Sequence, residues 1–157
     1  MQQHATITEA RFAGNADLRS AAKSGRRPIH KILVAFSAAY FVGALVTDLV
    51  YSQTPDVMWE RFSIWLITAG LILAGLAVVA YAIDLFAGSQ IDRPAWPRVV
   101  GYALAILLSL INAFVHSRDG YTAVVPTGLM LSGLVTVVLL LTAFVGMVLT
   151  NRSRVGG

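Results

Sequence analysis

The sequence predicts an all-α integral membrane protein, an antiparallel four-helix bundle that crosses the bilayer. Three observations predict this fold. The chain of 157 residues contains four long apolar runs, at 32–51, 62–86, 99–115 and 124–150, and about 20 apolar residues in a helix span the hydrocarbon core of a bilayer. Only 13% of the residues are charged, against about a quarter in soluble domains. The loops between the runs are short, as they are between antiparallel neighbours.

Each run predicts one span, and we expect the spans at about 30–51, 62–86, 97–116 and 124–150. The first run is too long for the core of a signal peptide, so we expect it to remain as a spanning helix. The fourth run is longer than a bilayer requires and should tilt or extend past the headgroups. Pro126 lies in its predicted first turn, where a helix tolerates proline. Aromatic residues near the predicted span ends are typical of membrane interfaces: Tyr51, Trp59, Trp65, Trp96 and Tyr121.

Residues 27–151 form the predicted transmembrane domain, between a flexible basic tail at 1–26 and a short tail at 152–157. The number of lysine and arginine residues on each side of the membrane predicts the orientation. With the N-terminus inside, ten of the twelve basic residues lie on the inner side, and only Arg61 and Arg118 lie outside. We therefore expect both termini to be cytoplasmic. The chain has no cysteine, which excludes disulfides and thiolate metal sites.

Small residues recur at four-residue spacing in the spans. Because lipid is as apolar as leucine, close packing of small residues is needed to hold membrane helices together. We expect these faces to form the helix contacts, although alanine and glycine are also simply common in membrane helices. The predicted packing residues are Ala39, Gly43, Gly70, Ala74, Gly101, Ala105, Ser109 and Gly146.

Polar and ionisable side chains in the spans fall into two groups by predicted depth. The inner group is His30 and Asp84, and the outer group is Asp48, Asn112, His116 and Arg118. Such groups are costly to place in a bilayer, so we expect each set to form polar contacts between spans. The alternative is that each side chain reaches interfacial water independently by snorkelling.

No cofactor, metal or enzymatic activity is expected. His30 and His116 lie at opposite ends of their spans, about 27 Å apart in depth at 1.5 Å per residue, so they cannot share a metal whose ligands lie within about 2 Å. The sequence has no glycine-rich phosphate loop and no metalloprotease or serine-hydrolase motif. Nor does it place an acid or base at mid-membrane, where a proton relay would need one.

Short sequence elements near the span ends resemble those of a known family. The entry to the first span reads Arg27-Pro28-Ile29-His30-Lys31, and that span ends in Thr47-Asp48-Leu49. The second span ends in Tyr81-Ala82-Ile83-Asp84, and the chain closes with Val145-Gly146-Met147-Val148-Leu149 and a basic tail. In these elements, over about residues 27–156, the chain resembles the small four-span bacterial membrane proteins catalogued as domain of unknown function 2231.

The chain also departs from the pattern of that family. Relatives often carry further histidines where Arg27 and Ala35 stand here, and another in the C-terminal tail near Arg152. If those histidines bind a metal or haem in relatives, this chain keeps only His30 of the set. The resemblance therefore implies a four-span fold in the inner (cell) membrane of a bacterium, and it transfers no activity.

Together these observations favour a non-enzymatic structural or accessory subunit of the membrane. The expected partners are the lipid bilayer, anionic lipid at a basic collar formed by residues 23–27, and other membrane subunits or further copies of the chain. Nucleic acid is not expected. Two alternatives stay open: a redox-associated membrane subunit that binds haem or quinone, and a small oligomeric transporter or channel.

Overall fold

The computed structural model describes residues 29–54, 56–87, 96–118 and 124–155. The described elements are α2 (Ile29–Gln53), α3 (Val57–Phe86), α4 (Trp96–His116), the short π-helical segment η1 (Val124–Gly128) and α5 (Leu129–Val155). Four helical stretches are long and apolar enough to cross a membrane. The predicted all-α, four-span fold is therefore confirmed. The predicted tail at 1–26 and the collar at 23–27 lie outside the described residues.

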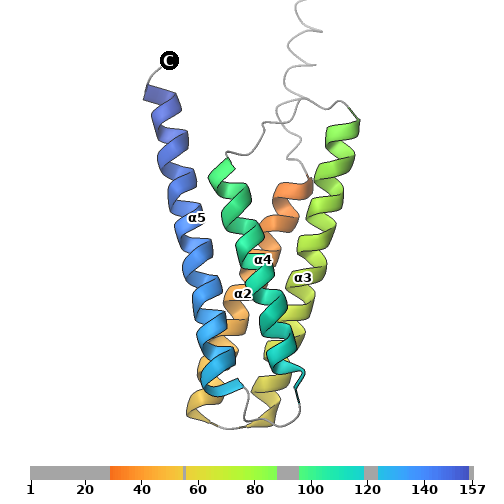
Figure 1. The fold of residues 1–157 in the computed structure, drawn as a ribbon, viewed down its shortest axis with the longest axis vertical. Helices are drawn as coiled ribbons and strands as arrows, with labels where there is room; N and C mark the ends of the chain where they lie inside the picture. Colours follow the sequence, from red (N-terminus) through yellow and green to blue (C-terminus); the bar gives the residue numbers. More distant parts are fainter. Residues whose placement is uncertain (1–28, 55, 88–95, 119–123, 156–157) are drawn as a thin grey trace, which may run out of the picture.

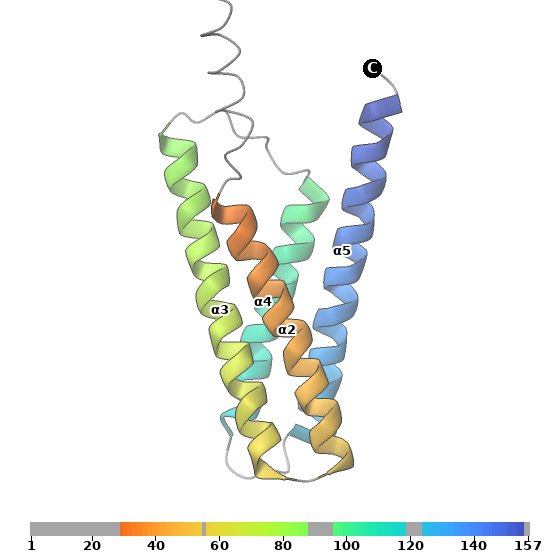
Figure 2. The same cartoon turned by 180° about the vertical axis from the view of Figure 1, so that it is seen from behind.

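The four long helices run antiparallel to their neighbours in the chain (Figure 1). Both views place α3 and α5 on opposite sides, with α4 in front of α2 in Figure 1 and behind it in Figure 2. Helix α2 packs against α3 and α5, and α4 packs against the same two helices. The start of α2 and the end of α5 lie at one end of the bundle, which we call the His30 end. The α2–α3 connection and η1 lie at the other, the Asp48 end. An even number of spans produces this arrangement.

Helix α3 begins at Val57, earlier than the predicted start at residue 62. The expected span began after the charged residues Glu60 and Arg61, but a cap at Asp56 decides the observed start. Asp56 precedes the helix with extended backbone, and its side chain accepts a hydrogen bond from the Met58 amide at 2.9 Å. Glu60 in the first turn complements the positive end of the helix dipole. These two acidic residues stabilise the first turn of α3.

The fourth span does not begin as the regular helix that was expected at residue 124. Val125 has extended backbone (φ −116°, ψ 123°), η1 contains a cis Val125–Pro126 peptide, and α5 starts only at Leu129. The proline ring disfavours helical backbone at the residue before it, and Val125 is extended accordingly. At its other end α5 continues to Val155. Its 27 residues span about 40 Å, which exceeds the hydrocarbon core of about 30 Å.

The apolar core is small and lies between α2, α4 and α5. Phe41, Ala105 and Val135 are its buried members, with Leu71 and Leu108 among the half-buried residues packed against it. Most large apolar side chains instead lie on the outside of the bundle, and no more than 28% of any span's apolar window is buried. This inside-out distribution suits lipid as the surrounding solvent.

The structure places the predicted packing residues on different faces. Gly70, Ala74, Ala105, Ser109 and Gly146 are buried, and Gly43 and Gly101 are half-buried. The prediction that Ala39 packs against another helix of the same chain is wrong, because Ala39 is exposed on the outside of α2. The buried face of α2 instead carries Ser37, Phe41, Ala44 and Asp48. Alanine can face lipid without penalty, whereas hydroxyl and carboxyl groups require partners, so the polar residues determine which face turns inward.

Gly70 and Gly75 of α3 form a matched pair for testing the helix contact. A Cβ atom on Gly70 would lie 2.6 Å from Cε1 of Phe41, whose ring is fixed in the core, whereas a Cβ on Gly75 would meet nothing within 4 Å. We expect Gly70→Ala to lower the free energy of unfolding by about 1–3 kcal/mol through overpacking. Gly75→Ala should not lower it, because the added methyl group meets nothing and alanine favours a helix over glycine. Denaturation of both variants in the same detergent measures this difference, and equal effects would contradict the predicted contact.

Candidate functional site: a buried aspartate that links four helices

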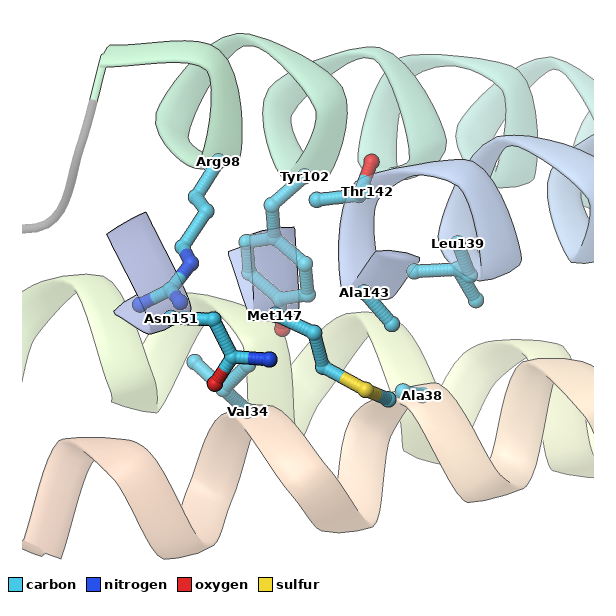
Figure 3. A pocket seen from close by; sticks show the side chains of 9 residues that line it. All are labelled: Val34, Ala38, Arg98, Tyr102, Leu139, Thr142, Ala143, Met147 and Asn151. Atoms are coloured by element: carbon cyan, nitrogen blue, oxygen red, sulfur yellow. The ribbon is translucent and has the colours of Figure 1, made fainter. Parts of the chain in front are cut away.

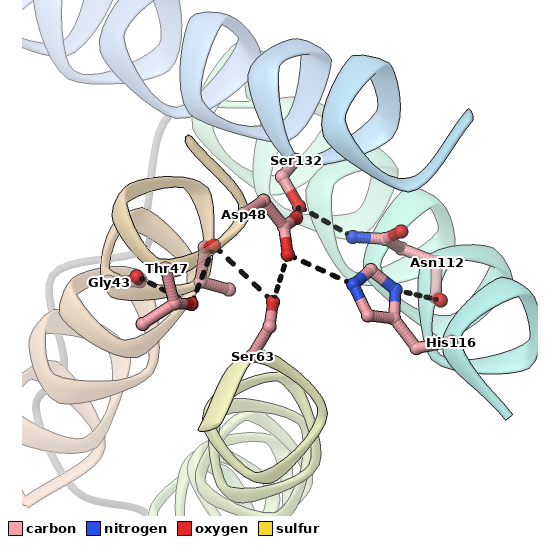
Figure 4. A network of polar contacts seen from close by, with 8 residues as sticks. Gly43, Thr47, Asp48, Ser63, Asn112, His116 and Ser132 are labelled. Carbon is pink, nitrogen blue, oxygen red and sulfur yellow. Dashed lines mark hydrogen bonds and ion pairs between the residues drawn. The ribbon is translucent and has the colours of Figure 1, made fainter. Parts of the chain in front are cut away.

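The strongest concentration of buried polar groups surrounds Asp48 (Figure 4). Asp48 lies on α2, five residues before that helix ends at Gln53, and it is fully buried. Its partners come from each of the other three long helices: Ser63 from α3, His116 from α4 and Ser132 from α5. One carboxyl group therefore contacts all four spans.

The Asp48 carboxyl group accepts more than one hydrogen bond on the same oxygen. Ser63 Oγ donates to Oδ1 in a short contact, and Ser132 Oγ donates to Oδ2. His116 Nε2 lies 3.0 Å from Oδ1, and both side chains of this pair have no exposed surface. A buried carboxylate without such partners would be very unfavourable, so these contacts compensate for its removal from water.

The partners of His116 determine where its hydrogens lie. Nδ1 is 3.0 Å from the main-chain carbonyl oxygen of Asn112, and because a carbonyl can only accept, Nδ1 must carry a hydrogen. The Nε2–Asp48 contact then holds one further hydrogen. Either His116 is an imidazolium that donates to a carboxylate, or Asp48 is protonated and donates to a neutral ring. The pair has no net charge in either arrangement, which suits a site closed to solvent.

Asp48 also determines the orientation of the Asn112 amide. The single hydroxyl hydrogen of Ser132 is donated to Asp48, so Ser132 Oγ can only accept from Asn112, whose Nδ2 lies 2.7 Å away. A flipped amide would bring two acceptor oxygens together. With the orientation fixed in this way, the buried Asn112 Oδ1 has no hydrogen-bond partner within the described part of the chain.

Gly128, the last residue of η1, provides room for the His116 ring. A Cβ atom on Gly128 would lie 2.7 Å from His116 Cε1. The irregular η1 segment therefore brings a residue without a side chain against the ring. Because Val125 in η1 has extended backbone, the regular helix α5 starts only after Gly128.

The predicted inner pair meets at the other end of the bundle. His30 Nδ1 lies 3.1 Å from Asp84 Oδ2 and joins the start of α2 to the end of α3. The ring of Tyr81 packs edge-on against His30, with ring centroids 5.3 Å apart. About a third of the Asp84 side chain is exposed (34%), so this pair reaches the interface while the Asp48 group does not.

Of the predicted outer group, Asp48, Asn112 and His116 lie together, and the prediction for Arg118 is wrong. Arg118 follows α4 and is exposed, and none of the described contacts around Asp48 includes it. Arg118 lies two residues beyond the end of α4 at His116. Water at the interface can solvate the guanidinium there, so it needs no buried partner.

Sequence reasoning missed the two serines that donate to Asp48, together with Gly128. Ser63 and Ser132 are single hydroxyls in apolar surroundings, and such residues often bond to their own helix backbone instead. Two further interhelical contacts were also missed: Ser37 with the Tyr102 hydroxyl, and Arg98 Nη2 with the Gly146 carbonyl. The one available signal was that Ser63 lies near the outer end of its predicted span, as Asp48 does.

The described residues offer little for a metal. They contain no group of three or more His, Asp or Glu side chains placed to hold one. His30 and His116 lie at opposite ends of the bundle, as their sequence positions predict, and each contacts an aspartate. Both ring nitrogens of His116 are engaged in hydrogen bonds.

A family model described as a predicted membrane protein (DUF2231) matches residues 26–157. This match covers most of the chain, including all four long helices and both aspartate–histidine pairs. The chain belongs to this family. The predicted resemblance is therefore confirmed. The description of the DUF2231 family supports the membrane location and names no activity. No curated protein and no solved structure matches the chain.

The two aspartates provide a matched test of the network. Asp48→Ala should lower the free energy of unfolding by about 3–5 kcal/mol, because it removes one partner of a buried pair. Asp84→Ala should cost about 0–1 kcal/mol, since that pair is partly solvated. The loss in the free energy of unfolding for Asp48→Asn should lie between these two values, because an amide can still donate to His116 Nε2. Denaturation in detergent measures all three variants, and similar losses at both positions would contradict this assignment.

Proposed function

We propose that this chain is a non-enzymatic structural or accessory subunit of the bacterial inner membrane. The observation that carries the proposal is the Asp48 network. Its carboxyl, imidazole and hydroxyl groups are bonded to one another across four helices, in a site without exposed side-chain surface at Asp48 and His116. A catalytic acid or base must reach a substrate, whereas these groups contact neighbouring helices. They are placed to hold the bundle in one arrangement.

The outer surface supports a role in contacts within the membrane. Large apolar side chains are exposed on every span, including Phe36 on α2, Ile72 on α3, Phe114 on α4 and Phe144 on α5. Lipid covers such a surface in a lone protein, and partner helices can replace it where shapes match. We propose that other membrane subunits, or further copies of this chain, pack on part of it.

Two further features belong to this proposal. Both termini are proposed to be cytoplasmic, because ten of the twelve basic residues then lie on the inner side. The basic collar at 23–27 is proposed to engage anionic lipid, at about 1 kcal/mol for each basic residue near the surface. The collar and the spans would together keep the protein at the membrane. Nucleic acid is not a proposed partner.

The partner prediction can be tested by mild detergent extraction of the full chain from its native membrane. We expect one membrane partner, or a second copy, to co-purify at fixed stoichiometry. Crosslinking before extraction controls for partners gained in detergent. A protein that stays monomeric and unpartnered in both experiments would contradict the accessory role. A haem Soret band in the purified protein would instead support the redox alternative, and ion or solute flux into liposomes would support the channel alternative.

The orientation can be tested with reporters fused to the C-terminus. A fluorescent protein that folds only in the cytoplasm should be bright, and alkaline phosphatase, which is active only outside, should be inactive. Fusion after Thr54, between α2 and α3, should give the opposite result for both reporters. The reverse pattern would overturn the proposed orientation.

A further inference from the structure

The amide oxygen of Asn112 is a buried polar atom that has no hydrogen-bond partner within the described part of the chain. Asn112 as a whole is 2% exposed. Figure 4 shows its amide nitrogen pointing toward Ser132, with the oxygen on the opposite side of the amide. An amide oxygen that is removed from water without a hydrogen bond is unfavourable, and native proteins rarely leave one in this state. Asn112 Oδ1 therefore needs a further donor.

The side chains around Asn112 have already donated their hydrogens. The hydroxyl groups of Ser63 and Ser132 both donate to Asp48. Both ring nitrogens of His116 are engaged, one with Asp48 and the other with the main-chain carbonyl of Asn112. None of these groups can turn a hydrogen toward Asn112 Oδ1 without losing a contact inside the bundle. The donor must therefore come from outside the Asp48 network.

Ser109 is a second buried polar residue beside Asn112. It precedes Asn112 by three residues on α4, so the two side chains share one face of the helix. Ser109 is 2% exposed, and none of the described contacts around Asp48 includes it. Side chains on a helix tilt toward its N-terminus, which brings the Asn112 amide toward the turn that carries Ser109. Two buried polar groups are therefore neighbours at this point.

The chemistry of the site requires an occupant that is small and uncharged. Asp48 and His116 together carry no net charge, so an ion would bring an uncompensated charge into the spans. The same face of α4 carries the small side chains of Ala105 and Ser109, which leave space that a larger side chain would fill. Asn112 lies four residues before α4 ends at His116, which is about 6 Å along the helix axis. Water at the interface is therefore close to the site.

A separate groove between α2, α4 and α5 does not reach Asn112 (Figure 3). Val34, Tyr102 and Met147 are among the residues that line this groove, and Asn112 is not one of them. On α4, Ala105 of the apolar core lies between Tyr102 and Asn112. A lipid or another large molecule in the groove would therefore leave the amide oxygen without a donor, and a partner for this oxygen must be enclosed within the bundle.

We propose that one water molecule binds inside the bundle, where it donates a hydrogen bond to Asn112 Oδ1 and also bonds to the Ser109 hydroxyl. Buried waters in proteins typically join polar groups that lack other partners. Because water both donates and accepts, it can satisfy the amide oxygen and the hydroxyl group together. The water extends the chain of hydrogen bonds from Asp48 through Ser132 and Asn112 to Ser109. This site is independent of the proposed accessory role.

A crystal structure of the full chain, grown in a lipidic mesophase and at a resolution that shows ordered water, tests the site directly. We expect one water peak at about 2.7–3.2 Å from both Asn112 Oδ1 and Ser109 Oγ. A direct hydrogen bond between the two side chains would overturn the proposal. So would an apolar contact at Asn112 Oδ1 with no water peak beside it.

Variants test the two partners of the water in the same crystals. Ser109→Ala removes one partner, so we expect the water peak to weaken or disappear while Asn112 stays in place. Thr68→Val is the control, because the Thr68 hydroxyl bonds to the Ile64 carbonyl of its own helix, and it should keep the peak. An undiminished peak in Ser109→Ala would overturn the assignment of Ser109 as a partner.

A double-mutant cycle in detergent provides a measurement that needs no crystals. If the water joins the two residues, Ser109→Ala should lower the free energy of unfolding less in an Asn112→Leu background than in the natural sequence. Thr68→Val should have the same effect in both backgrounds. Equal effects of Ser109→Ala in the two backgrounds would overturn the proposed bridge. If Asn112→Leu does not fold, Asn112→Ala supplies the background.

Discussion

The buried Asp48 carboxyl group is the constraint on which the rest of the structure depends. A carboxyl group within the spans needs hydrogen-bond donors, and in this bundle the donors come from α3, α4 and α5. Satisfying Asp48 therefore sets the rotation of each helix about its axis at this end of the bundle. Small side chains let the helices approach, but they fit several rotations, and the hydrogen-bonding requirement distinguishes between these rotations.

The irregular start of the fourth span is consistent with this constraint. The His116 ring must reach Asp48 and also donate to the Asn112 carbonyl, and Gly128 leaves the space that the ring occupies. A regular helix through Pro126 would require helical backbone at Val125, which the proline disfavours. The η1 segment connects α4 to α5 in a geometry that a continuous helix would not give.

The two ends of the bundle differ in how tightly the fourth helix is held. At the Asp48 end, Ser132 joins α5 to the closed network. Toward the His30 end, the pair of His30 and Asp84 links only α2 and α3, and α5 contacts α4 through Arg98 and Gly146. The groove lies beside this second contact.

The sequence by itself determined the membrane location and the four spans, because length and hydropathy are properties of each segment alone. Short sequence elements near the span ends indicated the family, which the family model confirms. It also determined that His30 and Asp84 lie at one depth and Asp48 and His116 at another. Which face of each helix turns inward was decided only by the tertiary structure: Ala39 faces outward, Arg118 stays outside the network, and Ser63 and Ser132 supply the donors. The physical reason is that hydrophobicity does not distinguish the faces of an apolar helix in lipid, so the contacts between helices must do so.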